Sequence, residues 1–459
     1  MLFDLIEESK KLISIRSVSS EGTRDLVEYL APFCRGLEFH IAFQTAGNGQ
    51  GSHEVNLIAH IVPESAPDLC PGGLALVTHL DTVPPGDLSL WTETGGDPFR
   101  ATIKGDKIYG LGSADTKLDF LCKLSAVENV GLKNFKIPVA VIGTFGEERA
   151  LAGARLLRET GIIHPRFALV GEPSELRPVI AHKGILYMRA VYPHPSLIPG
   201  TQVPSPASGR GARQSRNPVR VRVFKGRAAH GSMPHLGENA IRKAVEWLFA
   251  EQGKNPGLQL ISIRGGTVHN VVPEECVVEV SEGEKPCPRI EFLKKFFHLM
   301  KTADAYLKTH RNDAFDPPRT TGNIGVIRGD EKKIEIEFDF RLIPETDGNE
   351  LYEIFQALPR EIQGARAEMI RSNAPMATDR RSEIARRVGE ALKEADLPVS
   401  FAAKSGNTEG AIFNAMGAES IVIGPGRSTG NIHAPNEYNE ISRLQKAVEF
   451  YTAFLKQFC

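Results

Sequence analysis

The sequence predicts an α/β protein in which a domain built on a mostly parallel sheet is interrupted by a smaller α+β domain. Two observations predict this class. Short apolar runs alternate with helical segments in the first part of the chain, which is typical of a sheet buried on both faces. A later region, residues 183–366, combines strand patterns with one long helical stretch. The length of 459 residues, about three times a typical ~150-residue domain, leaves room for both.

The elements of the first part follow from its periodicity. Residues 3–15 and 23–37 have the apolar spacing of amphipathic helices, and residues 116–129 are also predicted to be helical. Four short apolar runs are predicted to be strands: 56–61, 74–78, 138–144 and 167–171. Because functional residues of such sheets follow the carboxyl ends of the strands, candidate site residues are expected there.

The composition changes sharply at residues 193–218, which hold six prolines, three arginines and no acid. Each proline removes a hydrogen-bond donor and fixes φ, so this segment is predicted to be an exposed loop between strands at 185–191 and 219–224. Beyond it, a helix is expected at 289–308 and a strand at 332–342. The predicted domains are the first part of the sheet domain, the inserted α+β domain with its Pro-rich loop, and the second part of the sheet domain: 1–182, 183–366 and 367–459.

Composition and charge argue against several classes of protein. The 55 Lys and Arg residues balance 56 Asp and Glu, and a net charge of −1 provides no basic face for nucleic acid. No apolar run approaches the roughly 18 residues that a membrane span requires, and the acids near the N-terminus are unlike a signal peptide. The six cysteines form no CxxC pair, which predicts reduced thiols in a cytoplasmic protein.

The strand predicted at 74–78 is followed by His79 and Asp81. The two-residue period of a strand places them on one side, so the Asp81 carboxylate can hold the second ring nitrogen of His79. That arrangement orients metal-binding histidines in many proteins. A hydrogen-bonded histidine in a turn is the alternative interpretation.

Further acids and a second histidine follow other turns. Asp115 ends a glycine-rich turn before a predicted helix, where an N-cap is the alternative. Glu147 and Glu148 follow the strand at 138–144, and adjacent acids can divide the work, one binding a metal and the other taking a proton from water. An ordinary surface turn would also carry them. Glu172 follows the next strand, and His433 follows a Gly/Pro-rich turn late in the chain.

Two imidazoles and several carboxylates, each following a strand end or a turn, favour a metal site. Zinc accepts nitrogen and oxygen ligands, and carboxylates suit divalent ions in general. Five ligands with one bridging carboxylate would hold two ions about 3.5–4 Å apart, as in aminopeptidases. The joint pattern, rather than any single spacing, carries this prediction.

Seven segments match one known family in the same order over nearly the whole chain: THLDTVP (78–84), the pair WTETGGDPF and YGLGSADTK (91–117), GTFGEE (143–148), GEP (171–173), GRAAHGSMPHLGENAI (226–241), GGTVHNVVP (265–273) and IHAPNEYNEI (432–441). The chain therefore resembles the M20 family of metallo-hydrolases. That group includes acetylornithine deacetylase, succinyl-diaminopimelate desuccinylase and glutamate carboxypeptidase.

The resemblance implies a di-metal hydrolase domain and assigns its ligands. One ion would be bound by His79 and Glu172 and the other by Glu148 and His433, with Asp115 bridging the two. Two divalent ions are expected, zinc by default, with cobalt or manganese as alternatives.

The resemblance also implies the residues that act beside the ions. Glu147 would be the general base, and Asp81 would support His79. Family members carry a cis peptide bond after the bridging aspartate, which here is the bond from Asp115 to Thr116.

Substrate contacts are implied in both domains. The inserted domain pairs two subunits in the family, so a homodimer is expected, with His230 stabilising the oxyanion across the dimer and Asn270 reaching the substrate. Arg341 matches an arginine that binds the substrate carboxylate, a task that suits the guanidinium fork. Gly406 and Asn407 belong to a loop that lines the substrate pocket.

The implied reaction is hydrolysis of the amide bond in an N-acyl amino acid, of deacetylase or desuccinylase type, by water activated between two metals. The alternative is a dipeptidase or glutamate-type carboxypeptidase acting on small peptides with the same chemistry. A catalytically silent relative that only binds a metabolite is expected to lack a ligand or the base, and all six residues are present here. Neither nucleic acid nor a membrane is expected as a partner.

The chain departs from the family pattern at two insertions, residues 193–218 and about 282–320. Both insertions lie in the domain through which family members form dimers. They can therefore change the expected dimer and the roles of His230 and Asn270 across it, and they leave the five metal positions untouched. Two residues near the motifs have simpler interpretations. Lys117 is expected to be a solvated helix charge, and Glu437 to orient the loop of His433.

Overall fold

The computed structural model describes residues 3–47, 52–193, 218–330 and 332–459. The chain divides into two compact units, the first ending at His182 and resuming as Met376–Cys459, the second spanning Lys183–Pro375. The second junction follows strand β15 (Arg366–Asn373), beyond the expected boundary at residue 366, because β15 pairs with β9 (Gly184–Pro193) of the second unit. The predicted loop at 193–218 lies, except for its two end residues, outside the described residues.

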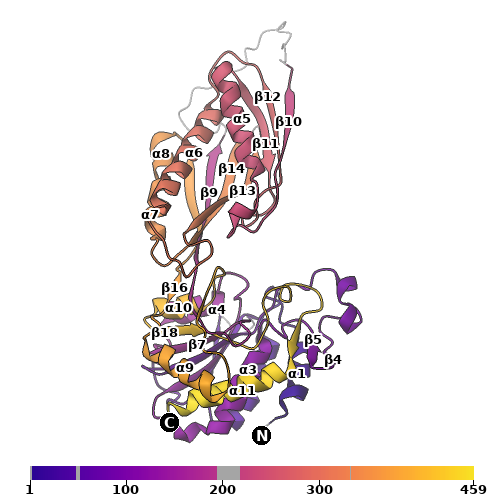
Figure 1. Ribbon diagram of the computed structural model, residues 1–459, viewed down its shortest axis with the longest axis vertical. Helices are drawn as coiled ribbons and strands as arrows, with labels where there is room; N and C mark the ends of the chain where they lie inside the picture. Colours follow the sequence, from indigo (N-terminus) through magenta and orange to yellow (C-terminus); the bar gives the residue numbers. More distant parts are fainter. Residues whose placement is uncertain (1–2, 48–51, 194–217, 331) are drawn as a thin grey trace. The chain divides into compact units, whose positions relative to one another are not determined.

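The first unit is built on a mixed sheet of nine strands in the described residues (Figure 1). Its centre is parallel, in the order β6, β3, β7 and β18, and the outer pairings are mostly antiparallel. This confirms the predicted α/β class with a mostly parallel core. The strands are β1 (His40–Thr45), β2 (Val55–His60), β3 (Leu74–His79), β6 (Val139–Thr144), β7 (Phe167–Gly171), β8 (Val179–His182), β16 (Met376–Ala377), β17 (Ala402–Lys404) and β18 (Glu419–Val422).

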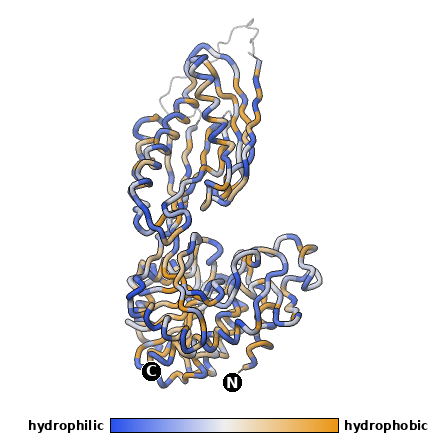
Figure 2. The backbone as a smooth tube through the Cα atoms, in the orientation of Figure 1, coloured by the Kyte–Doolittle hydropathy of each residue, from blue (hydrophilic) through white to orange (hydrophobic). Residues whose placement is uncertain are grey.

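The central strands are buried on both faces, and their side chains alternate between two cores. In β3, Leu74 and Leu76 point into one core while Ala75 and Val77 point into the other, as the strand period requires. Apolar residues run through these strands in Figure 2. Because both faces are covered, polar side chains can gather only at the strand ends.

Helices cover both faces of this sheet. In Figure 1 the C-terminal helix α11 lies beside α3, although the two are far apart in the sequence. One core receives α1 (Leu5–Ser14), α2 (Arg24–Gly36), α3 (Lys117–Val130), α9 (Glu383–Glu394) and α11 (Ile441–Lys456). The other receives α4 (Ala152–Thr160) and α10 (Gly410–Ala415). A small antiparallel sheet comprises β4 (Thr102–Lys104), β5 (Lys107–Tyr109) and β19 (Tyr438–Glu440).

The second unit is an antiparallel sheet of seven strands in the described residues, with a core of its own. Its strand order is β10, β12, β11, β13, β14, β9 and β15. Besides β9 and β15, the strands are β10 (Arg220–Lys225), β11 (Gln259–Gly265), β12 (Glu275–Ser281), β13 (Thr321–Gly329) and β14 (Lys333–Leu342). The helices are α5 (Ala240–Lys254), α6 (Pro288–Leu307), α7 (Gly348–Phe355) and α8 (Ala357–Glu361).

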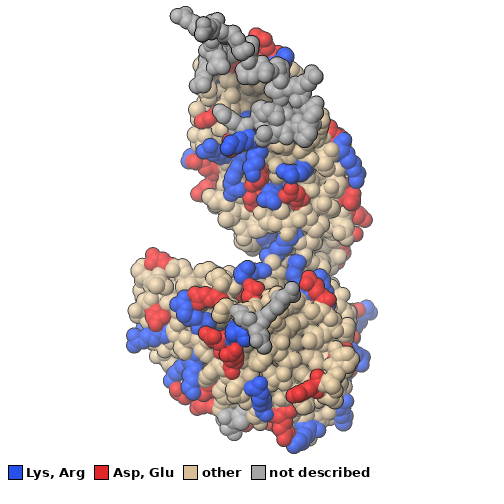
Figure 3. Space-filling view, turned by 180° about the vertical axis from the view of Figure 1, so that it is seen from behind, with Lys and Arg blue, Asp and Glu red and all other residues tan. Residues whose placement is uncertain are grey.

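The surface of both units carries charges of both signs. In the view of Figure 3, Lys and Arg are interspersed with Asp and Glu on the face of each unit. Among the described residues, no helix combines the length and apolar character needed to cross a membrane.

Candidate metal centre

Three neighbouring parallel strands of the first unit deliver acids and an imidazole to one edge of the sheet. His79 is the last residue of β3, which lies between β6 and β7. Glu147 and Glu148 follow the end of β6, and Glu172 follows the end of β7. Because these strands are parallel, their carboxyl ends lie at the same edge, as expected for a functional site in an open α/β sheet.

The fourth acid, Asp115, precedes helix α3, and its peptide bond to Thr116 is cis, as the family resemblance implied. The preceding loop is held by the buried carboxylate of Glu437. Its Oε1 accepts the backbone N–H groups of Ala114 (2.8 Å) and Asp115 (3.0 Å), and its Oε2 accepts that of Gly112 (3.2 Å). Glu437 therefore orients the loop of Asp115, whereas it was expected to orient the loop of His433.

The structure brings all five predicted ligands, and also Glu147, into two groups. In each group, one possible ligand atom of every residue lies within 4.8 Å of those of the others. The first group is His79, Glu147 and Glu172, and the second is Asp115, Glu148 and His433.

Asp115 joins the two groups. Its Oδ1 lies 3.1 Å from Nε2 of His79, and its Oδ2 lies 3.2 Å from Nε2 of His433. His433 Nε2 is also 2.9 Å from Oε1 of Glu148. One carboxylate with an oxygen directed at each imidazole has the geometry of a bridging ligand.

The electrostatics of the cluster favour the binding of positive charge. Burial raises the pKa of Glu147 well above its ordinary value, and the neighbouring Glu172 and Glu148 raise it further. Burial and then Asp115 raise the pKa of Glu172 to about 8. Hydrogen bonds that the His433 ring donates to Asp115 and Glu148 raise the pKa of His433 to about 11. Asp115 is the exception: despite its burial, hydrogen bonds from His433 and His79 hold its pKa well below the usual range. Closely packed carboxyl groups with such opposed shifts are typical of a site that divalent ions would compensate.

Asp81 supports this centre through contacts that differ from the expected one. The His79 Nδ1 atom lies 3.1 Å from the backbone carbonyl of Asp81, whereas the nearer carboxylate oxygen is 3.7 Å away. The carboxylate instead accepts the backbone N–H groups of Glu147 (3.0 Å) and Glu148 (3.3 Å) and the hydroxyl of Ser19. Asp81 therefore orients the two acids as well as the imidazole.

Two buried groups near the centre were not identified from the sequence. Glu409, at the start of α10, accepts a hydrogen bond from the Thr144 hydroxyl (2.9 Å), and burial raises its pKa to about 7. Lys117, expected to be solvated, is fully buried, and its Nζ donates to the carbonyl of Ile15 (3.0 Å). Burial lowers the pKa of Lys117 to about 7. No sequence pattern indicated that either side chain is buried, because tertiary packing decides burial.

A fully buried ion pair lies beneath the end of β3. Lys123 and Asp119 of α3 are 2.6 Å apart, and neither side chain is exposed. The Lys123 ammonium also donates to the carbonyl of Val77 (2.6 Å) and to the hydroxyl of Thr78 (2.9 Å). The Tyr451 hydroxyl of α11 donates to Asp119 (2.5 Å). These hydrogen bonds hold the two residues of β3 that precede His79.

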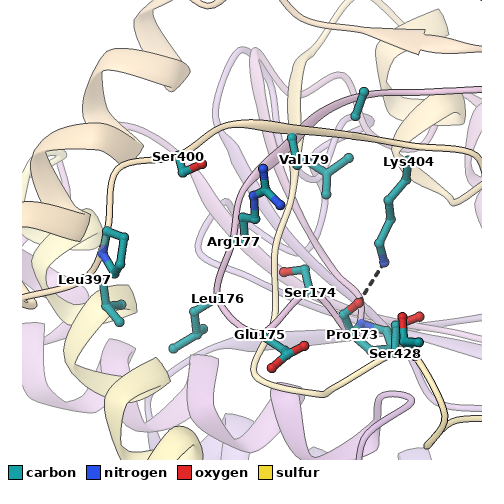
Figure 4. A pocket seen from close by; sticks show the side chains of 14 residues that line it. Pro173, Ser174, Glu175, Leu176, Arg177, Val179, Leu397, Ser400, Lys404 and Ser428 are labelled. Atoms are coloured by element: carbon teal, nitrogen blue, oxygen red, sulfur yellow. Dashed lines mark hydrogen bonds between the residues drawn. The ribbon is translucent and has the colours of Figure 1, made fainter. Parts of the chain in front are cut away.

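A cavity of about 490 Å³ in the first unit is lined by Pro173, the residue after Glu172, and by the residues that follow it. Its walls include the segment after Glu172 and strand β17 (Figure 4). The Lys404 ammonium donates to the carbonyl of Pro173 (2.7 Å), and Figure 4 shows the Arg177 side chain between Ser400 and Ser174. The predicted pocket residues Gly406 and Asn407 lie in the turn between β17 and α10 and do not line this cavity.

In the second unit the structure brings His230 and Asn270 together. The Gly231 N–H donates to the Asn270 carbonyl (2.7 Å), and His230 forms an isolated bridge with Val271. The Ser232 backbone N–H donates to Nδ1 of His230 (3.2 Å), which leaves Nε2 as the protonated nitrogen when the ring is neutral. Burial, followed by Arg341, lowers the pKa of His230, so the neutral ring prevails at neutral pH.

Arg341, on β14, is almost buried, and its Nε donates to Oδ2 of Asp339 (2.8 Å). The guanidinium has further N–H groups besides this one, in the fork geometry that binds carboxylates. Burial nevertheless raises the pKa of Asp339 to about 6, because the attraction of Arg341 only partly offsets the loss of solvent.

This shift predicts a pH dependence of stability. The pKa of Asp339 rises from 3.8 to about 6 on folding, so the folded protein holds the proton more tightly than the unfolded chain does. The associated stability is present below pH 3.8 and is lost as the pH rises to about 6. Calorimetry of the metal-free wild type and of metal-free Asp339→Asn provides the test. Between pH 3.8 and about 6, the melting temperature of the wild type should fall relative to that of the variant, and above pH 6 the difference between the two should be constant. Parallel curves would contradict the assignment.

Comparison with known sequences is consistent with this centre. Residues 75–457 match the peptidase family M20/M25/M40. An acetylornithine deacetylase from Photorhabdus laumondii is 35% identical over 187 residues. That match covers 39% of this chain and 46% of the deacetylase, so the chain spans about half the length of this relative.

Solved structures share the fold over the full chain. An aminoacylhistidine dipeptidase from Vibrio alginolyticus aligns with a TM-score of 0.68 at 18% identity, covering 99% of this chain and 96% of the dipeptidase. A metallo-carboxypeptidase of the M20 family from Sulfolobus solfataricus aligns with a TM-score of 0.61 at 18% identity and covers 99% of both chains. With the family match over most of its length and the fold in common, the chain belongs to the peptidase family M20/M25/M40.

Proposed function

We propose that this protein is a metal-dependent hydrolase that cleaves the amide bond of an N-acyl amino acid. The observation that carries this proposal is the meeting of four carboxylates and two imidazoles at one edge of the sheet, with Asp115 directed at both histidines. The family membership and the partial identity with acetylornithine deacetylase support it.

The donor set fits two divalent ions. His79, Glu172 and one oxygen of Asp115 would hold one ion, and His433, Glu148 and the other oxygen would hold the second. Nitrogen and carboxylate donors suit zinc, which we propose as the resident metal, with cobalt or manganese as alternatives. A pair of such ions lowers the pKa of water and polarises a carbonyl group.

Glu147 is the residue we assign as the general base. It lies within 4.8 Å of His79 and Glu172, and Asp81 fixes its backbone N–H. Its carboxylate would take the proton of the attacking water and return it to the leaving amine. A base whose pKa is raised by burial is suited to both transfers near neutral pH.

Residues of the second unit are proposed to bind the substrate. The protonated Nε2 of His230 would donate to the oxyanion, a contribution of roughly 10²–10³-fold in such sites. Asn270 beside it and the guanidinium of Arg341 would hold polar groups of the substrate, the latter its carboxylate. We retain Gly406 and Asn407 as pocket residues, and a homodimer formed through the second unit, as parts of this proposal.

Chelation and a substrate panel test the proposed function. We expect two metal equivalents per chain. Chelation should abolish hydrolysis and added zinc should restore it, because the protein side chains alone do not lower the pKa of water enough to make hydroxide. N-acetyl and N-succinyl amino acids should be hydrolysed with a kcat/KM at least about tenfold above that of dipeptides, since a site with polar contacts to one substrate discriminates by that much or more.

Metal content by mass spectrometry and kinetics on the same samples distinguish the alternatives. If the protein prefers dipeptides, the proposed N-acyl amino acid specificity is wrong and the protein is a dipeptidase or carboxypeptidase. Protein that binds two ions but hydrolyses neither class of substrate would indicate a silent relative.

A further inference from the structure

A second cavity, in the inserted unit, is lined by basic residues. Its volume is about 410 Å³, and besides Pro317 and Pro318 its walls are formed by five basic side chains: His235, Lys308, His310, Arg311 and Arg319. All of these except His235 belong to residues 282–320, the insertion that departs from the family pattern. No carboxylate is among the described residues that line this cavity.

The wall of this cavity is held in place by buried hydrogen bonds. The Lys183 side chain is fully buried, and its Nζ donates to the carbonyls of Pro317 (3.0 Å) and Arg319 (2.9 Å). The Asn312 N–H donates to the carbonyl of Pro318 (3.0 Å). The 317–319 segment is thus anchored to the unit from inside, so the Arg319 side chain projects from a held backbone.

The positive charges around the cavity are only partly compensated. Arg311 pairs with Asp313 at 2.6 Å, and Asp304 lines a neighbouring cavity that shares Lys308 and Arg319. Neither Lys308 nor Arg319 forms an ion pair within residues 3–47, 52–193, 218–330 and 332–459. Like charges that are only partly compensated repel one another, and an anion between them reduces that repulsion.

We propose that this cavity binds a small ligand that carries at least two negative charges, of the phosphate or polycarboxylate type. The Arg319 and Arg311 guanidinium groups present forks of N–H donors for anionic oxygens, while Lys308 adds a point charge. The two histidines supply further N–H donors. This site is independent of the proposed hydrolase function, since it uses none of the residues assigned to that reaction.

Calorimetric titration of the metal-loaded protein with inorganic phosphate, and separately with succinate at the same ionic strength, tests the proposal. The test variant is the double substitution Lys308→Gln with Arg319→Gln, and both positions are exposed. The matched control is Lys301→Gln with Arg360→Gln, which removes the same charge from exposed positions of the same unit. Hydrogen–deuterium exchange of residues 308–319 locates any binding, separately from the metal centre.

We expect at least one of the two anions to protect residues 308–319 in the wild type and in the control, and to bind the test variant about tenfold or more weakly. Stronger binding of phosphate identifies the phosphate class, and stronger binding of succinate the polycarboxylate class. If the test variant melts at a lower temperature, Arg319→Lys should retain binding. Protection by neither anion, equal affinity in the test variant, or an equal loss in the control would overturn the proposal.

Discussion

Replacing Glu147 with glutamine is expected to reduce amide hydrolysis by about 10²–10⁴-fold while both metal equivalents remain bound. The glutamine amide has nearly the same shape but cannot accept a proton from water. The surroundings would hold it in place, because the Asp81 carboxylate accepts the backbone N–H at this position (3.0 Å). The loss should therefore appear in kcat rather than in KM.

Two further substitutions separate the base from a ligand. Glu148→Gln is expected to lower metal affinity, since Oε1 of Glu148 lies 2.9 Å from Nε2 of His433. Glu159→Gln, at an exposed position of α4, should leave both metal content and turnover unchanged. Metal quantitation and steady-state kinetics of the three variants provide the test. If Glu147→Gln loses metal, Glu147 is a ligand, and if it retains near-parental turnover, the base lies elsewhere.

Replacing Asp119 with alanine is expected to lower the free energy of unfolding by about 3–5 kcal/mol, because it leaves the Lys123 ammonium buried without its partner. Both side chains are completely buried at a separation of 2.6 Å. Burial already lowers the pKa of Lys123, and Asp119 opposes that shift. The effect should extend to metal affinity, since Lys123 also holds Val77 and Thr78, which precede His79.

The exposed pair Arg386 and Glu390 is a matched control, because it has the same i,i+4 spacing on helix α9. Arg386→Ala should cost less than about 1 kcal/mol, as is usual for a solvated pair. The double substitution Asp119→Leu with Lys123→Met should recover much of the lost stability, because no unpaired charge is left. Urea unfolding of all three variants checks these values, and an Asp119→Ala loss as small as that of Arg386→Ala would refute the argument.

Much of the chemistry of the site was predictable because it depends on local sequence. His79, Glu147, Glu148 and Glu172 directly follow apolar runs long enough only for strands, and strands of a parallel sheet end at one edge. The fold class was predictable for the same reason, since the alternation of strand and helix patterns is local. The motif order then identified the family.

Support from distant parts of the chain was not predictable. Glu437 holds the Asp115 loop across more than three hundred positions of sequence, and no periodicity or motif shows which backbone N–H groups a late carboxylate will meet. Asp81 was predicted beside His79, but its bonds to the backbone of Glu147 and Glu148 depend on how β3 pairs with β6.

The sequence by itself determined which elements form, which side chains end the central strands, and to which family the chain belongs, because period, turn chemistry and motif order are written in neighbouring residues. Only the tertiary structure decided that Lys117 and Lys123 are buried and that the 282–320 insertion collects basic side chains around a cavity. Burial and unpaired charge are properties of packing. They arise when residues far apart in the sequence pack together and exclude water. The pattern of neighbouring residues does not show which distant residues will make these contacts.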